Sequence, residues 1–177
     1  QSLLQMLGAL DENLRITDHG RALARQPLHP RLAHMLVTAG KQAAPLAALL
    51  AERDPLRNRG TDLALRMRAL NDPNAFADAH RGSLARIRDE AKRLRRSAPD
   101  RLPLDLGDMA ALAYPDRIGL RRTGDAPRFV LSGGKGAILP PGDALSGHRL
   151  IVATDLDGDP REARIRQAVG FSDSALD

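Results

Sequence analysis

The spacing of apolar residues changes once along this chain, after the proline-rich stretch "SAPDRLPLD" at residues 97–105 and the short helix expected in "LGDMAALAYPD" at 106–116. Before this stretch, apolar residues recur every three or four positions, as they do in amphipathic helices. After residue 117, short alternating or β-branched runs are separated by Gly, Pro and Asp, which is typical of short strands. The sequence therefore predicts an α+β protein, in which an N-terminal helical array is followed by a small antiparallel β-barrel.

Several residues of the helical half mark the ends of helices. Thr17 is a good N-cap, and Pro27 ends the helix that Thr17 begins because proline has no N–H to donate. His29 and Pro30 restart a helix at once, since proline suits the first helical position. Gly40 is a plausible C-terminal stop for that second helix. The segment "TDHGRALARQPLHPRLAHML" is therefore expected to be helix, sharp joint, helix.

Two later helices are also expected. Asp54, directly before Pro55, is interpreted as the cap of the first. The second covers residues 83–96, where one stripe of its surface is apolar; the stripe comprises Leu84, Ile87, Ala91 and Leu94. The other faces of this helix carry most of its charge.

Composition excludes several classes of site. The chain has no cysteine, so it forms no disulfide and no thiolate metal site. This fits a cytoplasmic protein, and no apolar run is long enough to span a membrane. Aromatic residues make up only 2% of the chain, so the core must be aliphatic. Because the sequence begins at Gln1 inside a leucine-rich segment, we expect it to be a piece of a longer chain.

Positive charge is concentrated in the helical half. The net charge is +5 and the isoelectric point is about 10.6. Residues 1–98 hold 17 basic and 10 acidic side chains, whereas residues 99–177 hold 10 and 12. The stretch "RGSLARIRDEAKRLRR" places seven basic residues on one expected helix. Such a helix can neutralise phosphates without reading bases, or it can simply be a solvated face with internal ion pairs.

The sequence lacks complete motifs for ATP binding, calcium binding and catalysis. The segment at 131–139, "LSGGKGAIL", lacks the phosphate-loop pattern because Lys135 is followed by glycine, so we interpret it as a hairpin turn. The segment at 155–166 imitates a calcium loop, but Pro160 and Arg166 occupy positions that need Gly and an acid. We interpret it as an acidic turn between strands. The five histidines lack metal-site spacing, so no catalytic residue and no metal ligand is predicted.

The residue patterns nevertheless resemble a known family. "LGALD", then T-x-x-G-R-x-x-A and P-L-x-P-R-L-A-x-M-L, is similar to the segment that follows the motor domains of DEAH-box helicases. Further on, "ALAYPDRIGLRR", "FVLSGGKGAIL" and "IVATDLDG" resemble the bacterial HrpB-type ATP-dependent helicases. The resemblance implies the tail of a winged-helix domain at 1–28 and a helicase-associated, ratchet-like bundle at 29–98. It implies a linker at 99–105 and an OB-like β domain at 106–177.

The resemblance also implies a function. The chain would be an accessory C-terminal region that lines a channel for single-stranded nucleic acid, usually RNA, and couples motor movement to translocation. Two RecA-like motor domains of the parent chain would bind ATP and Mg and hydrolyse ATP. This chain has no Walker A or DExH motif, so we expect no hydrolysis by the chain alone. A stand-alone nucleic-acid-binding module and a helical scaffold for protein partners remain as alternatives.

Basic residues are the candidate phosphate contacts. They come from the basic helix and from the β domain: Arg86, Arg93, Arg96, Arg117, Arg121, Arg122 and Lys135. Base stacking is expected to be minor, because Tyr114 and Phe129 are the only aromatic candidates of the β domain before Phe171.

Overall fold

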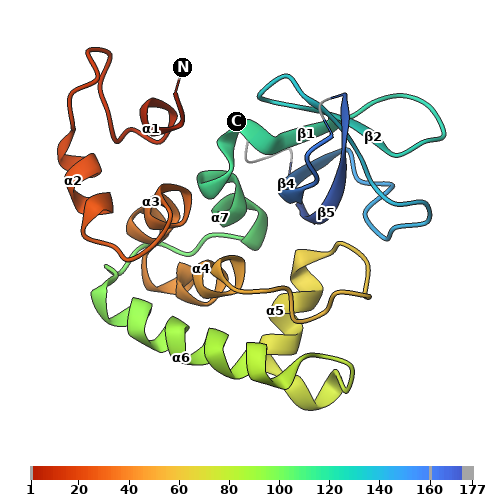
Figure 1. Cartoon of the computed structure of the whole chain (residues 1–177), viewed down its shortest axis with the longest axis horizontal. Coiled ribbons are helices and arrows are strands. Elements are labelled where there is room, and N and C mark those ends of the chain that lie inside the picture. The colour runs from red at the N-terminus through yellow and green to blue at the C-terminus, as the bar shows by residue number, and fades with distance from the viewer. Residues whose placement is uncertain (1, 160, 173–177) are drawn as a thin grey trace.

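The computed structural model describes residues 2–159 and 161–172, and it places helices around one side of a closed barrel (Figure 1). The helices are α1 Leu3–Met6, α2 Asp18–Ala24, α3 Pro30–Ala39, α4 Ala44–Ala51, α5 Leu63–Asn71, α6 Arg81–Ser97 and α7 Leu106–Ala113. Short 3-10 turns are η1 Gly40–Ala43, η2 Pro73–Ala75 and η3 Pro115–Arg117. The predicted α+β class, a helical array followed by a small OB-like barrel, is confirmed.

The predicted joint between α2 and α3 is present. Thr17 caps α2, its hydroxyl accepting from the N–H of Gly20 at 2.9 Å. The α2 helix ends at Ala24, shortly before Pro27. The ring of His29 accepts from the N–H of Arg31 at 3.2 Å, and α3 begins at Pro30 as expected. The sequence therefore determined this joint locally.

The cap predicted at Asp54 is wrong. Asp62 caps α5 instead, accepting from the N–H of Ala64 at 3.0 Å. Asp54 accepts from the N–H of Leu56 in a turn, and its carboxylate binds the guanidinium of Arg66. The Asp54 carboxylate therefore pairs with a residue twelve positions away and does not cap a helix.

Helix α6 packs its predicted stripe against α4. Leu84, Ile87 and Leu94 are buried, and they belong to one large apolar core. This core runs through α3, α4 and α7 and reaches Val152 and Val169 of the barrel. Figure 1 shows α6 along the lower edge and α7 between α3 and the barrel. The helical array and the barrel therefore share one core. The residue bounds of the predicted domains stay predictions.

The barrel closes in the order β1-β2-β3-β5-β4. Its strands are β1 Ile118–Arg121, β2 Arg128–Leu131, β3 Gly136–Ile138, β4 Leu150–Leu156 and β5 Glu162–Gly170. The pairing of β3 with β5 is parallel, whereas the other pairs are antiparallel. The expectation of antiparallel strands is therefore wrong at this one pairing, because β5 closes the barrel against a strand to which no hairpin connects it.

Both glycine- and aspartate-rich segments are connections between strands. Residues 132–135 form the turn of the β2–β3 hairpin, as predicted. Asp157 lies between β4 and β5 and accepts from the N–H groups of Asp159 and Arg164 at 3.2 and 2.8 Å. Pro160, which stands where a calcium loop needs glycine, lies outside the described residues. Within the described ranges, no helix is long and apolar enough to cross a membrane.

Candidate nucleic-acid interface

A cavity of about 520 Å³ lies where the helical array meets the barrel. Its walls come from the joint at 27–30, the first turn of α3, the end of α4, η3 and the end of β4. The joint singled out in the sequence therefore lines a cavity between the two halves of the fold. Leu28, between the two prolines, packs against both the large core and the smaller core under α2 and α3.

Arg31 ties the two halves together at this cavity. Its Nη1 and Nη2 donate to Oδ1 and Oδ2 of Asp116 at 2.7 and 3.0 Å, and Nη1 also donates to the carbonyl of Ala113 at 3.2 Å. The hydrogen bonds from Arg31 hold the pKa of Asp116 below its usual range, although partial burial opposes them. A bidentate guanidinium–carboxylate pair fixes geometry as well as charge. Helix α3 and η3 are therefore held in one orientation.

Two guanidinium groups flank the ring of Tyr114. The Cζ atoms of Arg31 and Arg117 lie 5.0 and 5.2 Å from the ring centroid. Burial raises the pKa of Tyr114, so its phenol stays neutral. Within the described ranges, Arg117 forms no salt bridge, although its charge also contributes to the lowered pKa of Asp116. Its charge and one face of its guanidinium are therefore available to an anionic ligand in the cavity.

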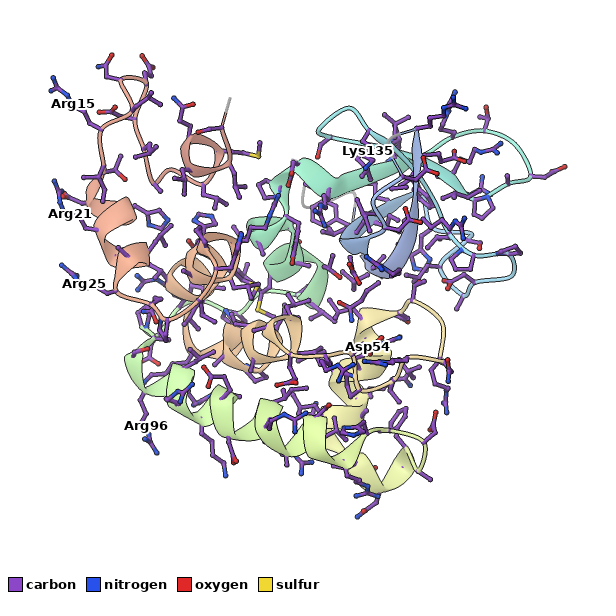
Figure 2. All side chains as sticks on the ribbon, in the orientation of Figure 1. Arg15, Arg21, Arg25, Asp54, Arg96 and Lys135 are labelled. Carbon is purple, nitrogen blue, oxygen red and sulfur yellow. The ribbon has the colours of Figure 1, made fainter. Side chains whose placement is uncertain are left out.

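The other basic candidates of the barrel differ in availability. The guanidinium of Arg121 donates to the carbonyls of Ser146, Arg122 and Gly124 at 2.6, 3.1 and 3.2 Å. These bonds hold barrel loops, so Arg121 is primarily structural. Arg122 is exposed beside a second hollow at the β1–β2 loop. Lys135 lies on the β2–β3 turn (Figure 2).

The candidates on α6 form a separate group. Arg86 pairs with Glu52 at 3.4 Å, and Arg93 pairs with Glu90 one turn before it. Arg96 projects from the C-terminal end of α6, far across Figure 2 from Lys135, and forms no ion pair within the described residues. The structure therefore does not gather the seven predicted contacts at one site. It divides them between the barrel with its cavity and the outer face of α6.

Aromatic stacking is limited to one residue of the predicted pair. Phe129 is fully buried in the barrel core, so its ring is unavailable to a base. Tyr114 remains at the cavity, but the guanidinium groups of Arg31 and Arg117 already lie over its ring. Base contact at this site would therefore be to a guanidinium plane rather than directly to the tyrosine.

Sequence reasoning missed a half-buried histidine pair and one buried arginine. Nε2 of His19 lies 2.7 Å from Nδ1 of His34, joining α2 to α3, and nothing in their spacing of fifteen residues predicts this. Arg66 is fully buried among apolar residues of α5. A signal for Arg66 was present, because it lies between Leu63 and Leu70 at helical spacing and hence on the apolar face.

Comparison with known proteins gives this arrangement a class. Residues 2–28 match the model of the helicase associated domain (HA2), winged-helix. The N-terminal segment is therefore similar to part of a helicase-associated winged-helix domain, and the helical array and the closed barrel follow it in the chain. Over 156 residues, 85% of the chain, it is 36% identical to the ATP-dependent RNA helicase HrpB of Escherichia coli strain K12.

Solved structures agree with the sequence match. The crystal structure of the E. coli DExH-box NTPase HrpB superposes with a TM-score of 0.73 at 33% identity over 98% of the chain. A second structure, of the E. coli DEAH/RHA helicase HrpB, gives 0.75 at 29% identity over 97%. The chain is thus similar in sequence and fold to part of HrpB. It spans 18% of the curated relative and 21% of each solved chain.

Proposed function

We propose that this chain lines the path of single-stranded nucleic acid, with RNA as the substrate, in an ATP-dependent helicase of the DEAH-box class. The RecA-like motor domains would belong to the same parent chain and would bind ATP and Mg. One observation carries the proposal: the cavity between array and barrel contains Arg117, a cation whose partner is the ring of Tyr114 and not a carboxylate.

The chemistry of the cavity suits a nucleic-acid strand. A guanidinium donates in a fixed fork to phosphate oxygens, and its plane stacks on bases. Arg117 can do either, while Asp155 at the cavity wall is offset by Arg166 at 3.4 Å. Contacts of this kind position a strand without reading its sequence. This agrees with a translocating enzyme, which must pass every base.

The joint provides a route for coupling. Pro27 and Pro30 restrict the backbone, and the Arg31–Asp116 pair fixes α3 against the segment that begins the barrel. Helices and barrel would therefore move together when a motor domain pushes on either. This supports the proposed transmission of ATP-driven movement to the strand.

Salt-dependent RNA binding by the parent enzyme tests the proposal. Replacing Arg117 and Arg122 by Ala should weaken binding and reduce the slope of log K against log salt concentration by about one for each lost contact. Arg121 is another predicted phosphate contact of the barrel. Because Arg121 holds loop carbonyls, it is better left in place.

A matched control uses two arginines elsewhere. Arg15 and Arg25 are exposed near α2, as Figure 2 shows, and Arg15→Ala with Arg25→Ala removes the same charge. The slope should then stay near that of the parent. Equal losses in both double variants would contradict a site at the cavity. Tight RNA binding by the isolated chain would instead favour a stand-alone nucleic-acid module.

The scaffold alternative receives less support. It requires an exposed apolar face on residues 29–98, all of which the structure describes. The large exposed apolar side chains lie outside that range: Leu4, Met6, Leu14, Ile16, Leu102, Leu104, Leu120 and Val130. The helical bundle therefore presents a polar surface, which favours the nucleic-acid proposal.

A further inference from the structure

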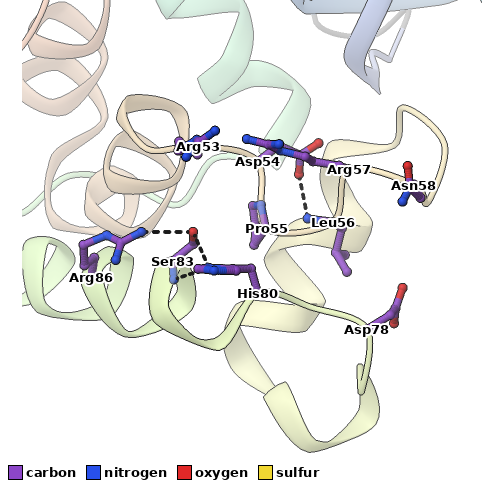
Figure 3. A pocket seen from close by; sticks show the side chains of 10 residues that line it. All are labelled: Arg53, Asp54, Pro55, Leu56, Arg57, Asn58, Asp78, His80, Ser83 and Arg86. Atoms are coloured by element: carbon purple, nitrogen blue, oxygen red, sulfur yellow. Dashed lines mark hydrogen bonds between the residues drawn. The ribbon is translucent and has the colours of Figure 1, made fainter.

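A second cavity, of about 390 Å³, lies between the loop after α4 and the first turns of α6 (Figure 3). Arg53 and Arg57 come from the loop, and Arg86 comes from α6. The cavity shares no lining residue with the one at the joint. Asp54 and Asp78 line the same cavity, so the charge that the three arginines present to a ligand depends on the partners of these two carboxylates.

The loop that carries Arg53 and Arg57 is held from behind by Arg66. Nε and Nη2 of Arg66 donate to the two carboxylate oxygens of Asp54 at 3.0 and 2.9 Å. Further donations reach the carbonyls of Leu56 and Gly60, both at 2.8 Å. A fully buried arginine with this many bonds fixes the loop backbone. The backbone positions of Arg53 and Arg57 are therefore fixed before any ligand binds.

The carboxylates at this cavity are already neutralised from outside it. Asp54 is paired with Arg66, and Asp78 is paired with Arg59 at 3.0 and 3.1 Å. Neither Arg66 nor Arg59 lines the cavity. Within the described residues, Arg53 and Arg57 form no side-chain hydrogen bond or salt bridge, although the charge of Arg53 contributes to the lowered pKa of Glu52. Because Asp54 and Asp78 have partners outside the cavity, the charges of Arg53 and Arg57 are in excess there, while Glu52 partly balances Arg86.

Arg86 and His80 complete the wall. Arg86 donates to Oγ of Ser83 at 3.2 Å and approaches Glu52 at 3.4 Å, so its guanidinium has a defined place. Nδ1 of His80 accepts from the N–H of Ser83 at 3.0 Å. A ring that accepts at Nδ1 carries its proton on Nε2, which is then a donor. The dashed lines in Figure 3 mark the contacts of Ser83 with Arg86 and with His80.

We propose that this cavity binds a phosphate-bearing ligand through Arg53, Arg57 and Arg86. Three cations and a histidine donor exclude a metal cation, whereas guanidinium forks match phosphate oxygens in shape and charge. The volume lies within the range of small-molecule sites and exceeds the need of a single phosphate. The phosphate has two sources, the backbone of a bound RNA strand or a free phosphate compound such as a nucleotide.

The test compares two charge-matched double variants of the whole chain. R53A/R57A removes the two loop arginines, and R15A/R25A removes two exposed arginines outside the cavity. All four side chains are exposed, so we expect both variants to fold, and thermal unfolding checks this. Calorimetry then measures the binding of inorganic pyrophosphate, and fluorescence anisotropy measures the binding of a short oligouridylate RNA.

The proposal expects a loss of about tenfold or more in R53A/R57A, since two charge-assisted hydrogen bonds are removed, and little change in R15A/R25A. A loss in the pyrophosphate measurement assigns the site to free phosphate compounds. A loss confined to RNA assigns it to the nucleic-acid backbone. Unchanged affinity in both measurements, or equal losses in both variants, overturns the proposal. None of these outcomes decides the salt-dependence test of Arg117 and Arg122, because that test removes other arginines.

Discussion

At the scale of single residues, Arg66 is the one buried charged side chain among the residues that the structure describes. It is fully buried, and Asp54 together with several loop carbonyls depends on it. Arg66→Met keeps the length but leaves a carboxylate and carbonyls without donors, so we expect a loss of about 3–5 kcal/mol in the free energy of unfolding. Urea denaturation measures it. Arg59→Ala, which breaks the half-exposed pair with Asp78, should cost at most about 1 kcal/mol.

His34 gives a prediction for pH. Burial, assisted by the neighbouring His19, lowers the pKa of His34 from 6.5 to about 4. Between these values the unfolded chain binds a proton that the folded chain does not, so the free energy of unfolding falls as pH falls from 6.5 to 4. Asp116 titrates below this window because its pKa is lowered. Melting temperatures of His34→Gln should show a flatter dependence. His29→Asn, which keeps a helix cap, should retain the parent's slope.

At the scale of elements, close backbone approach determines where α7 can lie. A Cβ on Gly107 would meet the carbonyl oxygen of Gly170 at 2.4 Å, so helix and strand β5 touch through a glycine. Gly107→Ala must push α7 away from the barrel, and we expect a loss of about 1–3 kcal/mol. Gly147→Ala is the control, since its Cβ would meet nothing within 4 Å. Equal chemical denaturation midpoints for the two variants would contradict this contact.

Local signals in the sequence determined local elements, and failures occurred where a distant partner competes. Thr17, His29 and Pro30 were interpreted correctly because each acts within three residues of itself. Asp54 was misassigned because its partner, Arg66, lies twelve residues away. The parallel pairing of β3 with β5 was missed for the same reason, since strands far apart in sequence carry no turn that reveals their direction.

The same limit applies to the candidate sites. The sequence identified basic side chains but not their partners, so Arg121, which holds loop carbonyls, ranked equally with Arg117. The cavity at the joint and the cavity beside α6 each combine segments that are far apart in the chain. Only the fold could bring these segments together, although the family resemblance placed the chain correctly as a whole.

At the scale of the whole molecule, the Arg31–Asp116 pair should make helical array and barrel unfold as one unit. Both side chains are mostly buried, at 13% and 26% exposure, and they join residues 85 apart. A double-mutant cycle with Arg31→Met and Asp116→Asn should give a coupling of about 1–3 kcal/mol. The Arg128–Glu162 pair, within the barrel and more exposed, should give less than about 1 kcal/mol.

The cooperativity of unfolding tests whether the Arg31–Asp116 pair couples the two halves or only stabilises its own surroundings. If the pair couples the two halves, helical and barrel amides of the parent chain exchange with one common opening free energy, and barrel amides of Arg31→Met exchange faster than helical ones. Because Val152 and Val169 also belong to the shared core, the loss of coupling should be partial and not complete. Uniform acceleration of exchange across both halves would show instead that the core alone joins them, and that the joint does not transmit motion through Arg31.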